Sequence, residues 1–129
     1  MNPLTALFSL KGRLRRRDFW LGSGVIWLAA IAMVVTAGVA LPHIWPGLTP
    51  GRGRAVAALI CLPVFLWMAF ALLTKRFHDR GRSAWAIANA LYPVRGWIWG
   101  FYECCADGTV GANAYGVSPK GDLADHEVF

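Results

Sequence analysis

Three long apolar runs dominate the pattern of hydrophobic and polar positions along the chain, at residues 19–41, 55–74 and 84–102. The first two contain no Asp, Glu, Lys or Arg. As α-helices with a rise of 1.5 Å per residue, they would reach roughly 34 Å and 30 Å, which matches the hydrocarbon thickness of a bilayer. Both runs are therefore predicted to span a membrane. The second is expected to bend near Pro63, because proline removes one backbone donor.

The third run differs because polar and helix-breaking residues lie near its middle, namely Asn89, Pro93, Arg95 and Gly96. An arginine at the centre of a bilayer costs roughly 2.5–3.5 kcal/mol on insertion scales, and the surrounding apolar residues offset part of this cost. The run is predicted to cross as a third, kinked helix, and the alternative is a re-entrant hairpin that turns at residues 92–96. We therefore expect one all-α integral membrane domain over residues 1–129, with a tail at residues 103–129.

The segments outside these runs are shorter and more polar. Prolines and glycines crowd residues 42–54, which are predicted to form the loop between the first two spans. At the N-terminus, apolar residues fall roughly on helical spacing, so this stretch is either a short helix lying on the inner leaflet or a frayed end. The residues on that spacing are Leu4, Leu7, Phe8, Lys11 and Leu14.

Basic residues set the expected orientation. With the N-terminus inside and three crossings, nearly all of the lysines and arginines outside the apolar runs lie on the inner side. Only Arg52, Arg54 and Lys120 would lie outside. Cytoplasmic segments of membrane proteins are enriched in Lys and Arg, so this orientation is preferred. The acidic tail would then lie outside after three crossings, or inside if the third run is a hairpin.

Two export signals and one soluble class compete with this interpretation. A cleaved signal peptide has an apolar core of about 7–15 residues, which is shorter than the run at residues 19–41. The Arg16-Arg17 pair resembles a twin-arginine signal, but further apolar segments follow it instead of a soluble domain. The formal charge of +6 suggests nucleic acid, but the cations adjoin apolar runs, and 57% of the residues are hydrophobic.

The two basic groups are candidate contacts for anionic lipid headgroups or a protein partner. Each Lys or Arg near an acidic leaflet contributes about 1 kcal/mol. The alternative is that these charges only set the topology. The candidate contact residues are Arg13, Arg16, Arg17, Arg76, Arg80 and Arg82.

Other reactive residue types give weaker indications. His78 beside Asp79 suggests a general base and its orienting acid, but no nucleophile accompanies them. Cys104 and Cys105 suggest a vicinal or intermolecular disulfide in an oxidising compartment, or have only a structural role. No catalytic residue, metal site, cofactor or small-molecule substrate is identified, and the chain is predicted not to be an enzyme. Arg95 is a candidate intramembrane functional charge, and a second hypothesis is a transporter or channel subunit that uses it with the kinked helices.

Small residues also recur on one face of the first run and would permit close approach of another helix. They are Ala29, Ala32, Thr36 and Ala40. Because three short spans bury little surface alone, a homo-oligomer is a further expectation.

Three motifs together resemble the small bacterial inner-membrane family called domain of unknown function 805. They are Gly-Arg-Leu-Arg-Arg-Arg-Asp-Phe-Trp at residues 12–20, Arg-Phe-His-Asp-Arg-Gly-Arg-Ser-Ala-Trp at residues 76–85, and Gly-Thr-Val-Gly-Ala-Asn-Ala-Tyr-Gly at residues 108–116. The chain departs from the family pattern at Phe77, Ala114, Arg95 and residues 117–119. The resemblance implies a bacterial inner-membrane location and no established activity.

Overall fold

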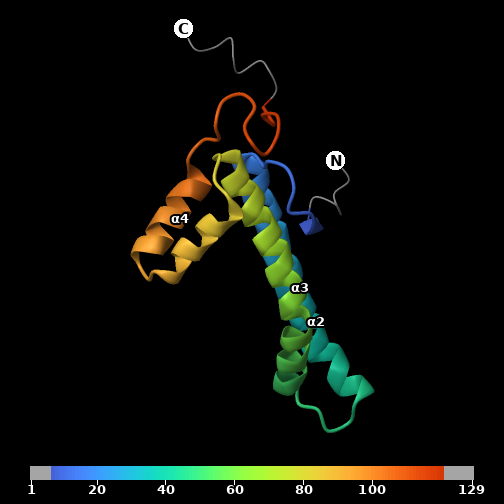
Figure 1. The fold of residues 1–129 in the computed structure, drawn as a ribbon. Helices are drawn as coiled ribbons and strands as arrows, with labels where there is room; N and C mark the ends of the chain where they lie inside the picture. The colour runs from blue at the N-terminus through green and yellow to red at the C-terminus, as the bar shows by residue number, and fades with distance from the viewer. Residues whose placement is uncertain (1–6, 121–129) are drawn as a thin grey trace.

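Two long antiparallel helices form the body of the computed structural model, which describes residues 7–120. They are α2 (Arg16–Ile44) and α3 (Pro50–Asp79), and they pack along their length (Figure 1). Both are long and apolar enough to cross a membrane, and few of their residues are buried inside the protein. The described residues contain no strand, only an isolated bridge between Asn113 and Gly116. The prediction of an all-helical fold is confirmed, and two of the three predicted spans form membrane-length helices.

Both helices extend beyond the apolar runs that predicted them, and the loop between them is shorter than the expected residues 42–54. Pro42 lies within the last turn of α2, where a proline forfeits only one hydrogen bond of the helix. Pro50 occupies the first turn of α3, where its missing donor costs nothing. The Thr49 hydroxyl caps this helix by accepting from the Arg52 amide at 3.4 Å. Helix α3 continues through Pro63.

Helix α3 ends in a Schellman motif that lies inside the second basic segment. Gly81 adopts a φ of +69°, and its amide donates to the His78 carbonyl at 3.0 Å. The amide of Arg82 donates to the Phe77 carbonyl at 2.9 Å. This pair of bonds needs a left-handed residue after the helix, which glycine adopts without steric cost. The motif redirects the chain at the end of α3.

The third apolar run is a helical hairpin and not one continuous helix. It comprises the 3-10 helix η1 (Ala84–Leu91) and the α-helix α4 (Arg95–Cys105), which pack together beside the α2–α3 pair (Figure 1). The turn between them is a γ-turn at Val94, with φ 64° and ψ −67°, closed by the Arg95 amide donating to the Pro93 carbonyl at 2.8 Å. The expected single helix over residues 84–102 is therefore wrong, because Pro93 and Gly96 break it, and the hairpin alternative describes the path.

The hairpin returns the chain to the end of the helix pair where α2 begins and α3 ends (Figure 1). Residues 106–120 pack at this end, against Arg13 and Asp79. The described part of the tail therefore lies at the same end as residues 13–17, which is the arrangement expected from the hairpin alternative. The acidic residues of the tail beyond residue 120 lie outside the described residues.

The main apolar cluster lies near the same end. Its buried members are Phe19, Ile26, Leu72 and Cys104. Leu7 and Leu14 pack against it, so two of the apolar residues predicted to face the inner leaflet face the protein instead. Leu4, at the start of that predicted helix, lies outside the described residues. The stripe at Ala29, Ala32, Thr36 and Ala40 is exposed.

Candidate functional site: a buried arginine–carboxylate cluster

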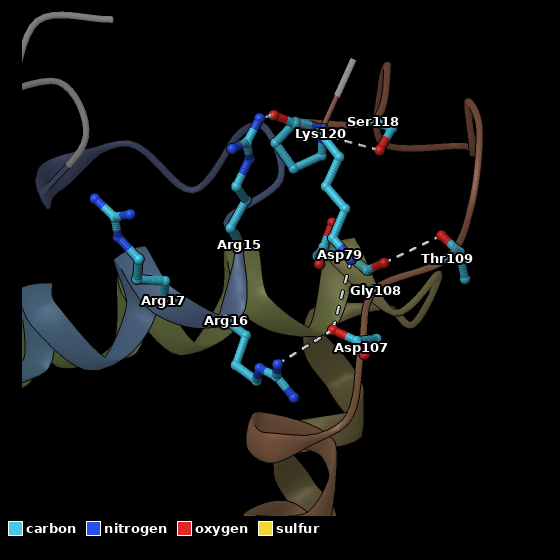
Figure 2. Close-up of a pocket in the computed structure, with 10 residues that line it drawn as sticks. Arg15, Arg16, Arg17, Asp79, Asp107, Gly108, Thr109, Ser118 and Lys120 are labelled. Atoms are coloured by element: carbon cyan, nitrogen blue, oxygen red, sulfur yellow. Dashed lines mark hydrogen bonds and ion pairs between the residues drawn. The ribbon is translucent and has the colours of Figure 1, made fainter. Parts of the chain in front are cut away.

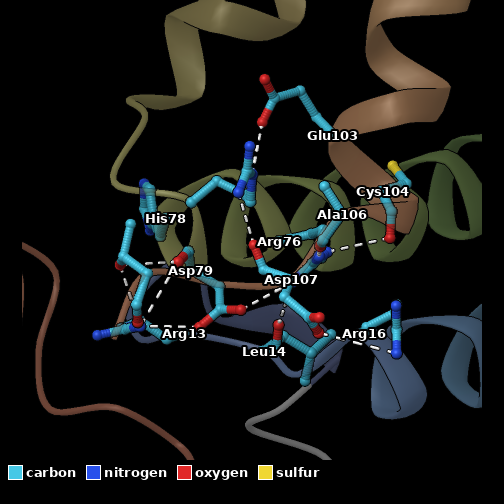
Figure 3. A network of polar contacts seen from close by, with 12 residues as sticks. Arg13, Leu14, Arg16, Arg76, His78, Asp79, Glu103, Cys104, Ala106 and Asp107 are labelled. Carbon is cyan, nitrogen blue, oxygen red and sulfur yellow. Dashed lines mark hydrogen bonds and ion pairs between the residues drawn. The ribbon is translucent and has the colours of Figure 1, made fainter. Parts of the chain in front are cut away.

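Three charged side chains from two distant segments meet inside the protein at the end of α3. Arg76 and Asp79 are three residues apart in the last turn of α3, so they share one helix face. The Asp79 carboxylate accepts from Arg76 Nη1 at 2.7 Å and from Arg13 Nε at 3.0 Å (Figure 3). All three side chains are at most 5% exposed. We call Arg13, Arg76 and Asp79 the arginine–carboxylate cluster.

Arg13 reaches the cluster from the segment before α2. The Leu14 amide donates to the Lys75 carbonyl at 3.3 Å, which holds this segment against α3. The remaining donors of Arg13 bind tail carbonyls, at 2.6 Å for Thr109, 2.6 Å for Gly111 and 3.2 Å for Gly116. A guanidinium carries five donors and tolerates burial only when they find acceptors. The tail therefore supplies the hydrogen-bond acceptors that the buried Arg13 guanidinium needs.

Arg76 connects α3 to the end of α4. Its Nε donates to the Cys104 carbonyl at 3.2 Å, and its second terminal nitrogen donates to the Ala106 carbonyl (Figure 3). The last carbonyls of a helix lack partners within the helix and carry the negative end of its dipole. Arg76 donates to such carbonyls, and its Nη1 also donates to the Leu14 carbonyl at 3.4 Å.

A second ion-pair group lies beside the cluster and fixes α4 against the end of α3. Glu103 is 1% exposed and accepts from Arg80 at 2.9 Å and from Arg82 at 3.1 Å. The Arg82 guanidinium lies 5.3 Å from the centre of the Trp99 ring, which itself stacks on Phe77 at 5.6 Å. Buried Glu103 is thus neutralised by two cations, one of which is also held over an aromatic face.

His78 and Asp79 point to different partners. The His78 ring stacks on Tyr115 with ring centres 3.9 Å apart, and its Nδ1 lies 3.3 Å from the Gly12 carbonyl oxygen. The Asp79 carboxylate is occupied by Arg13 and Arg76. The sequence juxtaposition does not produce the side-chain pair that a histidine general base and its orienting acid require.

The tail segment over residues 108–116 is an ordered part of the site. The Thr109 amide donates to the Asp79 carbonyl at 2.8 Å, and the Asn113 amide group donates to the His78 carbonyl at 2.9 Å. Gly108 lies so close to Asp79 that a Cβ there would overlap its carboxylate. The sequence pattern suggested only turns here, although the third motif of the family resemblance marked the segment.

The six arginines predicted to contact lipid or a partner divide into three groups. Arg13 and Arg76 are interior, so the expectation that they face headgroups is corrected, because their donors are used within the protein. Arg80 and Arg82 are partly and half exposed, and both bind Glu103. Arg16 and Arg17 face outward, and Arg16 forms a long ion pair of 3.8 Å with Asp107. Arg95 is exposed at the turn of the η1–α4 hairpin.

A pocket of about 140 Å³ opens above the cluster, between the start of α2 and the tail (Figure 2). Arg15, Arg16, Arg17 and Lys120 contribute cations to its wall, and Asp107 and Asp79 contribute carboxylates. From the sequence, Asp79 was a candidate only as the neighbour of His78, and Glu103 and Asp107 were not recognised as parts of the site. The available signal in the sequence was the large number of arginines close to a few carboxylates, which indicates buried ion pairs.

Residues 7–120 contain no disulfide bond and no cluster of metal-binding side chains. Cys61, Cys104 and Cys105 are free thiols. Burial raises the pKa of the Cys104 thiol to about 11, so this residue stays protonated and unreactive near neutral pH. In this part of the chain no group of three or more His, Cys, Asp or Glu residues is placed to hold a metal ion.

Several Escherichia coli K12 proteins are similar to this chain. "Inner membrane protein YhaI" is 31% identical over 93% of both chains, and "Inner membrane protein YhaH" is 30% identical over 85% of this chain and 86% of its own. "Uncharacterized protein YiiR" is 41% identical over 62% of this chain, and the match spans about half (48%) of that relative's length. No solved structure matches the chain significantly.

A family model described as "Protein of unknown function (DUF805)" matches residues 7–117. The matched range contains all three of the motifs that meet at the buried site, and two of the relatives are named inner membrane proteins. Over nearly all of the part that the structure describes, the chain therefore belongs to the DUF805 family.

Proposed function

We propose that the chain is a non-enzymatic inner-membrane protein that crosses the bilayer twice and binds anionic headgroups with the polar end of the α2–α3 pair, which faces the cytoplasm. The observation that carries this proposal is the placement of charge. Of the 13 lysines and arginines, all but Arg52, Arg54 and Arg95 lie at the end where α2 begins and α3 ends. Cytoplasmic segments are enriched in these residues, so this end is assigned to the inside.

The hydrogen bonds of Arg13 support an even number of crossings. Arg13 precedes α2, and its partners Thr109, Gly111 and Gly116 follow α4. Direct contact requires both segments to lie on one side of a bilayer whose hydrocarbon core is about 30 Å thick. Two crossings by α2 and α3 satisfy this requirement.

The η1–α4 hairpin is proposed to lie in the inner leaflet. Helix α4 has 11 residues, or about 16 Å, which is too short to cross. Its exposed aromatic and aliphatic side chains include Trp97, Ile98 and Phe101, and Trp85 is exposed on η1. Amphipathic aromatic side chains are enriched at the membrane interface.

Topology reporters test the crossings and the orientation. We would fuse alkaline phosphatase, active only outside, or a green fluorescent protein, fluorescent only inside, after Gly47, Gly81 and Phe129. The expected pattern is outside, inside and inside. An outside signal at Phe129 would contradict two crossings, and an outside signal at Gly81 would contradict the orientation.

Headgroup binding is supported by the outward basic side chains at the polar end, including Lys11, Arg15 and Arg17. Each such cation contributes about 1 kcal/mol near an acidic leaflet. Native mass spectrometry of protein extracted in a neutral detergent would count retained lipids. Arg15→Gln/Arg17→Gln should retain less phosphatidylglycerol than wild type.

The control for this experiment is Arg52→Gln/Arg54→Gln, which removes the same charge at the opposite end and should retain lipid as wild type does. Equal loss in both double variants would indicate a dependence on total charge and would refute a lipid-binding polar end. Retention of zwitterionic lipid alone by the wild type would also refute it.

A transport role is a second candidate because of Arg95. Among the described residues this side chain has no ion-pair partner, and it lines an open pocket of about 450 Å³ with Asn89, Tyr92 and Trp99. Arg95→Gln should abolish anion flux in reconstituted vesicles if this pocket belongs to a transport path. Absence of flux in the wild type would remove this candidate.

A further inference from the structure

The pocket beside the start of α2 combines cations from two segments that are distant in sequence. Arg15, Arg16 and Arg17 come from the N-terminal turn of α2 and the residue before it, and Lys120 comes from the tail (Figure 2). The Arg15 guanidinium donates to the Pro119 carbonyl, which holds the tail over α2. This contact joins the two walls of the pocket.

The net charge of this pocket is positive because four cations line it beside two carboxylates, one of which is already neutralised. Asp79 is bound by Arg13 and Arg76 from below. Asp107 is the other carboxylate, and its ion pairs are long, 3.8 Å to Arg16 and 3.6 Å to Lys120. The side chains of these pairs are all more than half exposed, and exposed pairs contribute little to stability.

We propose that this pocket binds the phosphate group of a phosphomonoester or phosphodiester, as carried by an anionic phospholipid, and that the phosphate displaces Asp107 from Arg16 and Lys120. This inference rests on the proposed headgroup binding and names its chemistry and location. A phosphate offers several strong acceptor oxygens, and the planar fork of arginine matches phosphate geometry. The N-terminus of the 29-residue helix α2 adds a positive dipole end.

In the proposed topology, the pocket would also lie at the depth where a lipid phosphate is found. Exposed Trp20 and Leu21 follow the pocket residues within one to two turns of α2. Tryptophan is enriched at the level of the headgroups, and the apolar face of α2 continues beyond it into the hydrocarbon. A phospholipid beside α2 would therefore carry its phosphate near Arg15, Arg16 and Arg17.

Because Asp107 competes with the phosphate, the proposal predicts the direction in which each substitution changes the affinity. The full chain in a neutral detergent is titrated with dihexanoyl phosphatidic acid, and the apparent Kd is taken from the rise of the thermal unfolding midpoint. Asp107→Asn should lower this Kd several-fold, because the competing carboxylate is gone. Lys120→Gln should raise it several-fold. Asp18→Asn is the matched control, since exposed Asp18 lies nearby in the first turn of α2 but does not line the pocket.

Two further ligands test which chemical group the pocket binds and whether that group comes from a lipid or from free phosphate. Inorganic phosphate tests the anion alone, and hexanoate tests a carboxylate with the same acyl length. Stabilisation by phosphatidic acid and by phosphate, but not by hexanoate, supports the phosphate site. Stabilisation by phosphatidic acid, but not by inorganic phosphate or hexanoate, supports a phosphate site whose ligand is a lipid.

Two results would overturn the inference. If Asp18→Asn lowers the Kd as much as Asp107→Asn does, or if hexanoate stabilises as well as phosphatidic acid, the pocket is not a phosphate site, although a basic lipid-binding surface survives. If phosphatidic acid does not stabilise the wild type and anionic lipid is not retained on extraction, the pocket and the proposed function fail together.

Discussion

The two ends of the α2–α3 pair are held together by opposite kinds of contact. At the polar end, Arg13 and Arg76 surround Asp79 in a buried group that needs three segments of the chain. At the loop end, backbones approach closely at Gly38 and Gly53, where a Cβ on Gly53 would lie 3.3 Å from the Ala37 carbonyl oxygen. One end therefore depends on matched charge, and the other depends on the absence of side chains.

The comparison has consequences for tolerance to substitution. A buried ion pair that loses one partner leaves an uncompensated charge, which costs far more than the pair itself contributes. A tight helix contact can relax by a small shift when the nearby atoms are able to move. The polar end should therefore be the more sensitive of the two.

Asp79→Asn should have the largest effect. It leaves Arg13 and Arg76 buried without a counter-charge, and we expect a loss of about 3–5 kcal/mol in the free energy of unfolding. Fluorescence-detected unfolding in a neutral detergent would measure it. Asp18→Asn, at an exposed position, is the control. A wild-type unfolding midpoint for Asp79→Asn would show that the cluster contributes no stability.

Gly108→Ala should come next, because its Cβ would overlap the Asp79 carboxylate. Overpacking of this kind costs about 1–3 kcal/mol. Gly53→Ala should cost less, since its nearest contact is 3.3 Å and alanine gains up to about 1 kcal/mol in helix propensity over glycine. The same unfolding measurement orders the two variants. A greater loss for Gly53→Ala would reverse the comparison between the ends.

Arg16→Gln should have the smallest effect on stability. Its ion pair with Asp107 is 3.8 Å long and more than half exposed, and such pairs contribute less than about 1 kcal/mol. The unfolding midpoint should stay close to that of the wild type. A loss comparable to that of Asp79→Asn would mean that the outer arginines belong to the structural cluster.

The sequence was sufficient to predict the two long helices, because runs without charge at residues 19–41 and 55–74 have few other solutions. The two basic segments were also recognised from the sequence, but all of their arginines were predicted to lie on one exposed surface, whereas Arg13 and Arg76 are buried. Burial of Arg13 depends on carbonyls of Thr109, Gly111 and Gly116, and backbone acceptors have no residue-type signature. Contacts of this kind become visible only when the fold brings the segments together.

The third apolar run, at residues 84–102, shows a different limit of prediction from sequence. Pro93, Arg95 and Gly96 indicated both a kinked span and a hairpin, and local sequence alone did not decide between them. The hairpin is favoured by contacts at its far end, where Glu103 binds Arg80 and Arg82. Likewise, the close approach of α2 and α3 uses Gly38 and Gly53, which the sequence pattern did not single out, and the exposed stripe at Ala29 and Ala32 stays a prediction of contact with another helix.

The bond from Arg13 to the Gly116 carbonyl joins residues 103 positions apart, which constrains the order of events during synthesis. The first basic segment leaves the ribosome long before its acceptors at residues 109–116 exist. Until then Arg13 must remain in water or at the lipid headgroups, because it has no buried acceptors. In the proposed two-crossing topology, α2 and α3 would therefore be in place before the cluster closes. A chain truncated before Thr109 would lack the carbonyls that bind Arg13, and its polar end would stay open.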